Sequence, residues 1–475
     1  MRSSPEKKAR LQLRWWHWLL LVFVFLLLLV VTVVLSLRTY GEQRYAQVLA
    51  ELKSQGKATT VDEVIAAAPA IDEDVQGRWS RWAAVAPNYP PSEVYADWPR
   101  FVSGAGPVPA AVLSEGDLHR ATMESALQLL RDGNVAFGVT GSLRGIPPAG
   151  ARTFLDVSRQ SSDDFLAVRS LATWLRHQAC LSGDPTIALS NLERLLRSGE
   201  TPGVLFDALS VIAVAETRDQ TYLDLALLGR LPSSLRTPWL TESPRHQEWL
   251  ARGFDGERAL LNDALSESMR SRSWFTAAFT TDPFETGFTE PWNPTHVFGG
   301  TWMWCTTVHD CALMAETEAH IAARLRRERT DPIPQDGVNR MWFVIGKISL
   351  PNLLMSASYG VNQIVGHRLN RLSVMLLEPS ADGLPRDEQD LIARFGQVLD
   401  LGGDHLRLRY EHLADDRFRL VVDPTTPVPN FVDASMVPGW SHDFGRPAAA
   451  DRLVIKRGSI ELQVPAVVRL PATTP

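Results

Sequence analysis

The chain has 475 residues, of which 45% are hydrophobic and 21% are charged. This length and composition are typical of a folded protein with one large core or two medium cores, and they exclude a largely disordered chain. The net charge of −6 is small and no long basic run follows the N-terminal tail, so we expect no nucleic-acid partner.

A transmembrane helix is the first element that the sequence predicts. The segment Trp15–Leu37 reads WWHWLLLVFVFLLLLVVTVVLSL. As a helix it would be about 34 Å long, enough to cross a hydrocarbon core of about 30 Å. A cleavable signal peptide would have a shorter apolar region followed by small residues, whereas this run is followed by SLRTYGEQRYAQ. We therefore expect an anchor that stays in the lipid bilayer.

The basic residues around this span are uneven, which predicts its orientation. Only Arg38 and Arg44 occur in the fifteen residues after the span, whereas the preceding tail, residues 1–14, contains Arg2, Lys7, Lys8, Arg10 and Arg14. Lys and Arg favour the cytoplasmic side of a membrane helix. The sequence thus predicts a single-pass protein of the inner (cytoplasmic) membrane, with a cytoplasmic N-terminus and a periplasmic bulk from about Arg38 onward.

An amphipathic stripe continues the anchor helix beyond the membrane. Tyr45, Val48 and Leu52 recur at helical spacing, and Gly56 is placed as the C-cap. In the following TVDE motif Thr60 is placed to cap a second helix, with Glu63 returning a hydrogen bond.

Residues 38–378 are predicted to form an α-helical body, because apolar residues at helical spacing recur along them. We find no clean repeat, so the fold class is mainly α, with an irregular helical bundle or α-solenoid as the body. The main predicted helices are Glu115–Arg131, Asp163–Leu181, Pro185–Arg197, Gly203–Glu216, Gln220–Leu228, Pro244–Met269 and Thr306–Arg329.

Residues 379–475 change to a β pattern. Leu406, Leu408 and Tyr410 alternate with polar residues, and Phe418 and Leu420 alternate again after a turn. Strict alternation on both sides of a turn is typical of a hairpin. The sequence predicts a small C-terminal β-hairpin element.

The stretch THVFGGTWMWCTTVHDC, residues 295–311, carries the weak candidates for chemistry. His296, His309 and Asp310 are the catalytic candidates, and Cys305 with His309 has a spacing that a zinc site can use. On a helix, however, the side chains of His309 and Asp310 diverge, and a further ligand at Cys311 would point about 200° from His309. We therefore expect neither a metal nor a cofactor here.

Three cysteines permit one disulfide in an oxidising compartment. If Cys305 and Cys311 both lie on one helix, they point about 240° apart and are about 9 Å apart along its axis, which is too far for a bond. A Cys305–Cys311 disulfide therefore requires a break in the helix, and the alternative is two separately buried cysteines.

An aromatic loop is predicted at 281–311, within the helical body. It contains Trp292, Trp302 and Trp304, and its large rings can either pin the loop onto the helices or form a partner surface. We favour packing, because so large an exposed apolar surface would promote aggregation.

The order of these parts resembles a set of uncharacterised single-pass, helix-rich envelope proteins of planctomycetes and related bacteria. The resemblance is carried by LAELKSQGKATTVDEV near the membrane, GFDGERALLNDAL in the middle, and HRLNRLSVMLLEP leading to LRLRYEHLADDRFRLVVD. It implies the same architecture from the basic N-terminus to the C-terminal hairpin, and it implies no activity.

The sequence therefore favours a membrane-anchored envelope protein that acts by binding or as a scaffold, with an envelope protein as its partner. Known catalytic signatures such as Gly-x-Ser-x-Gly and His-Glu-x-x-His do not occur. The alternative is a periplasmic hydrolase or ligand-binding enzyme with its site near residues 296–311.

Replacing Trp302 or Trp304 by Ala tests the packing hypothesis. If these rings are core anchors, each substitution should lower the free energy of unfolding by about 3–5 kcal/mol, and His309→Ala should cost far less. Calorimetry of the variants and the parent checks this. Unchanged thermal stability of both Trp variants would favour a recognition surface instead.

Overall fold

A computed structural model shows a mainly helical protein with one long apolar N-terminal helix. The structure describes residues 5–90, 94–102, 104, 106–136, 138, 154–242, 245–270, 294–326, 328, 356, 367–368, 370–377, 383–395, 408–414, 417–422, 453–456 and 459–463.

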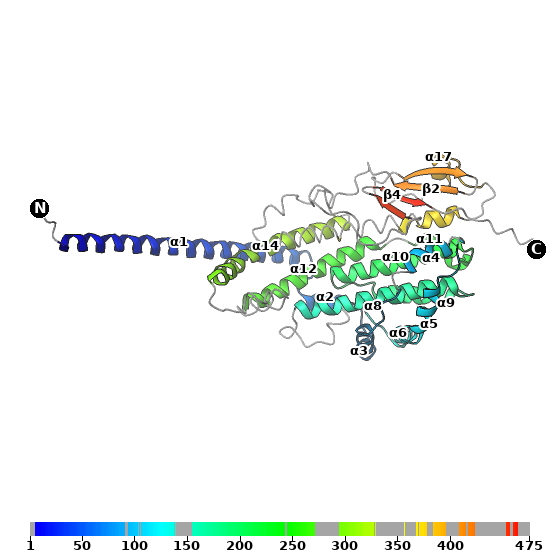
Figure 1. Ribbon diagram of the computed structural model, residues 1–475, viewed down its shortest axis with the longest axis horizontal. Helices are drawn as coiled ribbons and strands as arrows, with labels where there is room; N and C mark the ends of the chain where they lie inside the picture. Colours follow the sequence, from blue (N-terminus) through cyan, green and yellow to red (C-terminus); the bar gives the residue numbers. More distant parts are fainter. Residues whose placement is uncertain are drawn as a thin grey trace, which may run out of the picture. The chain divides into compact units, whose positions relative to one another are not determined.

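Helix α1 (Pro5–Ser54) is one unbroken helix of 50 residues (Figure 1). From Trp15 onward it is long and apolar enough to cross a membrane. Its side chains are exposed through the apolar run, for example Phe23 at 65%, whereas Tyr45 and Leu52 near its end are buried. Gly56 follows the helix with a φ of 70°, which confirms the predicted C-cap.

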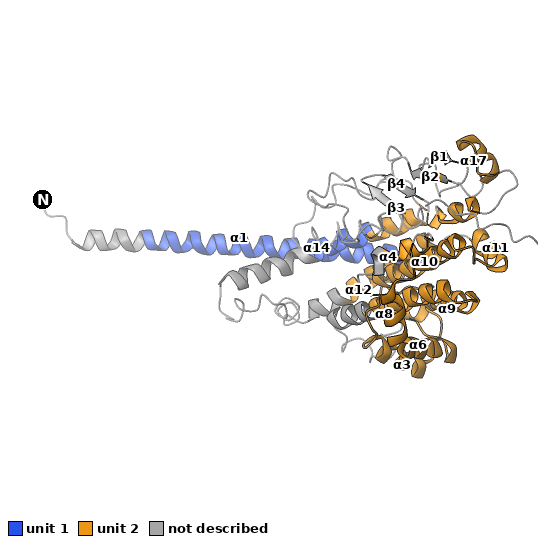
Figure 2. Ribbon diagram, turned by 45° about the vertical axis from the view of Figure 1, so that its right-hand side comes forward, with its two compact units in different colours: residues 1–57, 265–317, 334–350 blue, residues 58–264, 318–333, 351–475 orange. Residues whose placement is uncertain are grey.

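The chain forms two compact units, coloured separately in Figure 2. Unit 1 contains Met1–Lys57, Leu265–Thr317 and Pro334–Leu350, and unit 2 contains Ala58–Ala264, Glu318–Ile333 and Pro351–Pro475. Helix α14 (Pro294–Leu325) belongs to unit 1 up to Thr317, and the second half of α1 packs against this part of it. The guanidinium of Arg44 donates to both carboxylate oxygens of Glu316, with the shortest distance, from Nη2 to Oε2, at 2.8 Å.

Three helices lie side by side at the centre of unit 2: α8 (Phe154–Leu181), α9 (Thr186–Ser198) and α10 (Leu205–Leu227) (Figure 1). Each places leucine or other aliphatic side chains at helical spacing toward the others. The fully buried members of this core include Leu171, Leu175, Leu192, Leu195 and Val211.

Further helices belong to the described part of the chain. Their bounds are α2 (Val61–Ala67), α3 (Glu73–Ala83), α4 (Val94–Val102), α5 (Ala110–Leu118), α6 (Arg120–Asp132), α11 (Ser233–Thr241), α12 (His246–Arg270) and α17 (Glu388–Phe395). Thr60 caps α2 by accepting from the backbone N of Glu63 at 3.2 Å, as predicted. In return, the Glu63 carboxylate accepts a hydrogen bond from the backbone N of Thr59 at 2.6 Å. The expected donor was the backbone N of Thr60, one residue later in the chain.

Four strands occur near the C-terminus: β1 (Leu408–Ala414), β2 (Arg417–Val422), β3 (Leu453–Lys456) and β4 (Ser459–Gln463). They form an antiparallel sheet in the order β1-β2-β4-β3. Leu408 pairs with Val422 and His412 with Phe418, and the register shifts between His412 and Ala414.

The structure corrects three sequence predictions about where helices start and stop. The single helix predicted over Glu115–Arg131 is interrupted at His119, between α5 and α6. The predicted helices Gly203–Glu216 and Gln220–Leu228 are one helix, α10, because its charged middle is neutralised by other elements. Residues 294–305, predicted as part of the aromatic loop ahead of the helix Thr306–Arg329, are already helical in α14, where Pro294 occupies the first position and Gly299 and Gly300 are tolerated.

Helix α12 passes very close to the backbone before α10, and a glycine makes this possible. An ideal Cβ built on Gly256 would lie 1.5 Å from the carbonyl O of Gly203. Nothing larger than hydrogen fits there without moving the backbone.

Gly256→Ala should therefore lower the free energy of unfolding by about 1–3 kcal/mol, the usual cost of overpacking. The matched control is Gly77→Ala in α3, where the nearest atom to a new Cβ is Nη1 of Arg81 at 4.0 Å. That change should stabilise the protein by about 0.5–1 kcal/mol, because Ala favours a helix. Chemical denaturation of both variants measures the difference, and equal effects would contradict the close approach.

Candidate functional site

The predicted candidates His309 and Asp310 lie on α14 in unit 1, and both are buried, with exposures of 4% and 2%. Gly41 of α1 faces His309: an ideal Cβ on Gly41 would lie 3.1 Å from the His309 backbone N. The Tyr40 and His309 rings are 5.9 Å apart between centroids. His309 therefore lies where α1 and α14 touch.

The other predicted site residues are only partly within the described chain. The backbone of His296, Trp302, Trp304 and Cys305 belongs to α14, and their side chains lie outside the described residues, as does Trp292 altogether. Because α14 is unbroken between Cys305 and Cys311, it has the geometry that separates these two residues by about 240°. Among the described residues, no group of three His, Cys, Asp or Glu side chains could hold a metal ion.

A buried charged cluster in unit 2 is the candidate site that the structure reveals. It is centred on Arg218 and Asp219 in the middle of α10, which are 2% and 1% exposed. The sequence places these two charges in a gap between two predicted helices. The available signal was the run ETRDQT inside an otherwise helical pattern, which fits a buried polar site as well as a break.

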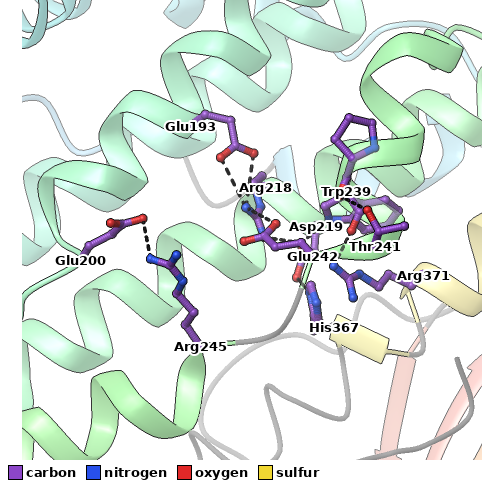
Figure 3. Close-up of polar contacts among 11 residues, drawn as sticks. Glu193, Glu200, Arg218, Asp219, Trp239, Thr241, Glu242, Arg245, His367 and Arg371 are labelled. Atoms are coloured by element: carbon purple, nitrogen blue, oxygen red, sulfur yellow. Dashed lines mark hydrogen bonds and ion pairs between the residues drawn. The ribbon is translucent and has the colours of Figure 1, made fainter. Parts of the chain in front are cut away.

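Arg218 is held by carboxylates from three elements (Figure 3). Its Nη1 lies 3.2 Å from Oε1 of Glu193 on α9 and 2.9 Å from Oε2 of Glu242, the C-cap residue of α11. Its Nη2 lies 3.4 Å from Oδ1 of Asp219. Burial raises the pKa of Glu193 even though the charge of Arg218 opposes the rise.

Both oxygens of the Asp219 carboxylate are engaged. Oδ1 accepts a hydrogen bond from Nε1 of Trp239 at 2.8 Å, and Oδ2 meets Nδ1 of His367 (Figure 3). Burial works to raise the pKa of Asp219, but the charges of His367 and Arg218 and these hydrogen bonds outweigh it, so the pKa is lowered. Asp219 is therefore a carboxylate that orients the His367 ring.

Arg371 adds a second contact between the segment 367–377 and the rest of the cluster. Its Nη2 donates to the backbone carbonyl of Trp239, and its guanidinium carbon lies 5.8 Å from the centre of the Trp239 ring. Burial lowers the pKa of Arg371 to about 10, which still leaves it charged at neutral pH. The Trp239 ring also stacks on Tyr222, with centroids 4.5 Å apart.

His246, the first residue of α12, completes the cluster. Its ring lies 5.4 Å from that of His367 between centroids and is almost entirely buried. Neither of its nitrogens, nor Nε2 of His367, has a hydrogen-bond partner among the described residues. Burial, with the repulsion of His367, lowers the pKa of His246 to about 3, so its imidazole is neutral at physiological pH.

A second buried charged group lies between α12 and the end of α14, also within unit 2. Arg258 is fully buried with Nη1 2.8 Å from Oδ1 of Asp255, and Glu318 is fully buried as well. Burial and the charge of Glu257 raise the pKa of Glu318 well above its ordinary value. A raised pKa favours the neutral form of Glu318, and the neutral form is less costly to bury than the carboxylate.

The carboxylate–imidazole arrangement of Asp219 and His367 is one that also orients general bases in enzymes. Here, however, the two side chains and His246 are nearly completely buried, so in this state a substrate could not reach them. What the cluster does in this state is join four parts of the chain: α9, α10, the end of α11 and the segment 367–377.

Compared with known proteins, the chain matches no family model, no curated protein and no solved structure.

Arg218→Met should be strongly destabilising, because it leaves Asp219 and two further carboxylates without their shared cation. We expect a loss of about 3–5 kcal/mol in the free energy of unfolding, the usual result of breaking a buried ion pair. The control is Arg245→Met, which removes an exposed ion pair to Glu200 (3.1 Å) and should cost about 0–1 kcal/mol. Denaturant titration of both variants tests this, and a similar loss in each would show that burial of Arg218 has no special energetic role.

Proposed function

We propose that this protein is a single-pass membrane-anchored protein of the bacterial envelope, with its N-terminus in the cytoplasm, its bulk in the periplasm and a binding or scaffold role. The observation that carries this proposal is the difference in exposure between the two parts of α1. Its apolar first part is exposed along its length, whereas its later part has one buried face that includes Tyr45, Val48 and Leu52.

An exposed apolar run of this length is unfavourable in water, whereas hydrocarbon solvates it and an unbroken helix satisfies its own backbone. The buried later part supports a firm anchor. Gly41, Tyr45 and Leu52 are buried, and Arg44 forms a bidentate ion pair with Glu316.

The basic tail before the span supports the proposed orientation, because it is richer in Lys and Arg than the segment after it. The two basic residues that follow the span are already paired: Arg38 Nε lies 2.6 Å from Oε1 of Glu42, and Arg44 is bound by Glu316.

A binding or scaffold role is favoured over hydrolysis at residues 296–311, since His309 and Asp310 are buried near α1 and adjacent on one helix. The same proposal includes a helical body that ends in a small β element. It also includes membership of the planctomycete-type envelope proteins that the sequence resembles. Its partners would be the lipid bilayer and another envelope protein.

The proposed orientation is tested with reporter fusions after Asp74 in a bacterial host. Alkaline phosphatase is active only outside the cytoplasm, so its fusion should be active, and a cytoplasm-dependent fluorescent protein at the same position should stay dark. Replacing Lys7, Lys8, Arg10 and Arg14 by Gln should reduce phosphatase activity, because it removes the charge asymmetry. An inactive phosphatase fusion together with a fluorescent reporter fusion would show the opposite orientation.

A further inference from the structure

The segment 367–377 is docked on the helical core of unit 2 by two polar contacts, and three of its apolar side chains are buried. His367 meets Asp219 of α10, and Arg371 donates to the carbonyl of Trp239 on α11. The buried apolar side chains of the segment are Leu372, Val374 and Leu376. The His367–Asp219 and Arg371–Trp239 contacts are therefore the links between this segment and helices α10 and α11.

His246 lies beside these contacts and is poorly placed to accept a proton. The charged groups that face it are Arg218 and Asp219 from α10 and His367 and Arg371 from the docked segment, and its own helix contributes the ring of Trp249 at 5.4 Å. The Asp219 carboxylate already binds His367, Trp239 and Arg218. A charge on His246 would therefore meet mainly positive neighbours.

We propose that the segment 367–377 is an acid-released latch, in which protonation of His246 places a buried positive charge against His367, Arg371 and Arg218 and detaches the segment from α10 and α11. The device does not depend on which side of the membrane the body occupies, so it can fail or succeed independently of the proposed topology.

The direction of the pH effect follows from proton binding in the two states. In the docked state burial holds the pKa of His246 at about 3, whereas an imidazole in water has a pKa of about 6.5. Between these values the undocked state binds more protons, so docking is fully favourable above about pH 6.5 and weakens as the pH falls. The equilibrium constant for undocking should rise about thirtyfold from pH 7.5 to pH 5.0.

Hydrogen–deuterium exchange of the full-length chain in detergent micelles tests the latch. After correction for the intrinsic pH dependence of exchange, amides in 370–377 should exchange about thirtyfold faster at pH 5.0 than at pH 7.5. Amides of α9, which lies away from His246 in sequence and carries none of the docking contacts, should not show this increase.

Two variants separate the latch from general acid sensitivity. His246→Phe keeps an apolar ring of similar shape without a titratable group, so it should abolish the increase, and the control His119→Phe at the α5–α6 junction should retain it. Asp219→Asn should give fast exchange of 370–377 at both pH values, with α9 still protected.

The proposal is overturned if the increase persists in His246→Phe, if α9 shows an equal increase, or if wild type shows none. Slow exchange of 370–377 at pH 7.5 in Asp219→Asn would also overturn it, because the contact would then not hold the segment. This last result is informative even if His246→Phe does not fold.

Discussion

The burial of Arg218 is the constraint on which the organisation of unit 2 depends. A guanidinium with almost no exposure must be neutralised, and the carboxylates that do so come from α9, from α10 and from the end of α11. Because the desolvation of such a group is costly, its partners cannot move apart independently. The ion pairs therefore link these three helices to one another through a single guanidinium.

Asp219 extends that constraint to a distant part of the chain. Its carboxylate is shared among Arg218, Trp239 and His367, and His367 lies 148 residues further along the sequence. One side chain of α10 thereby links the ion-pair cluster to the segment that precedes the C-terminal strands. A neutral, buried His246 next to this link makes it sensitive to protonation, because the Asp219 carboxylate near it is already bound by Arg218, Trp239 and His367.

Unit 1 follows a different physical rule. In α1 the same helix changes from an exposed apolar surface to a face buried within a protein core, and the change coincides with the appearance of polar residues after Leu37. Gly41 permits a close backbone approach to His309, and the Arg44–Glu316 pair adds a directional contact. A residue that looked like a catalytic candidate by its type is thus used at a helix contact.

The sequence by itself determined the features that depend on local spacing: the long apolar helix, the mainly helical class, the Gly56 cap and the Thr60 cap. These follow from hydrogen bonds and apolar periodicity within a few residues. It did not determine that Arg218 and Asp219 lie inside a continuous helix. Adjacent charges that interrupt an apolar helical pattern indicate a break between two helices unless their buried partners are known. Those partners, Glu193, Glu242, Trp239 and His367, are brought together only by tertiary packing. Only the tertiary structure could therefore decide that the polar centre of this protein lies at α10, because burying a charge is favourable only where distant residues compensate it.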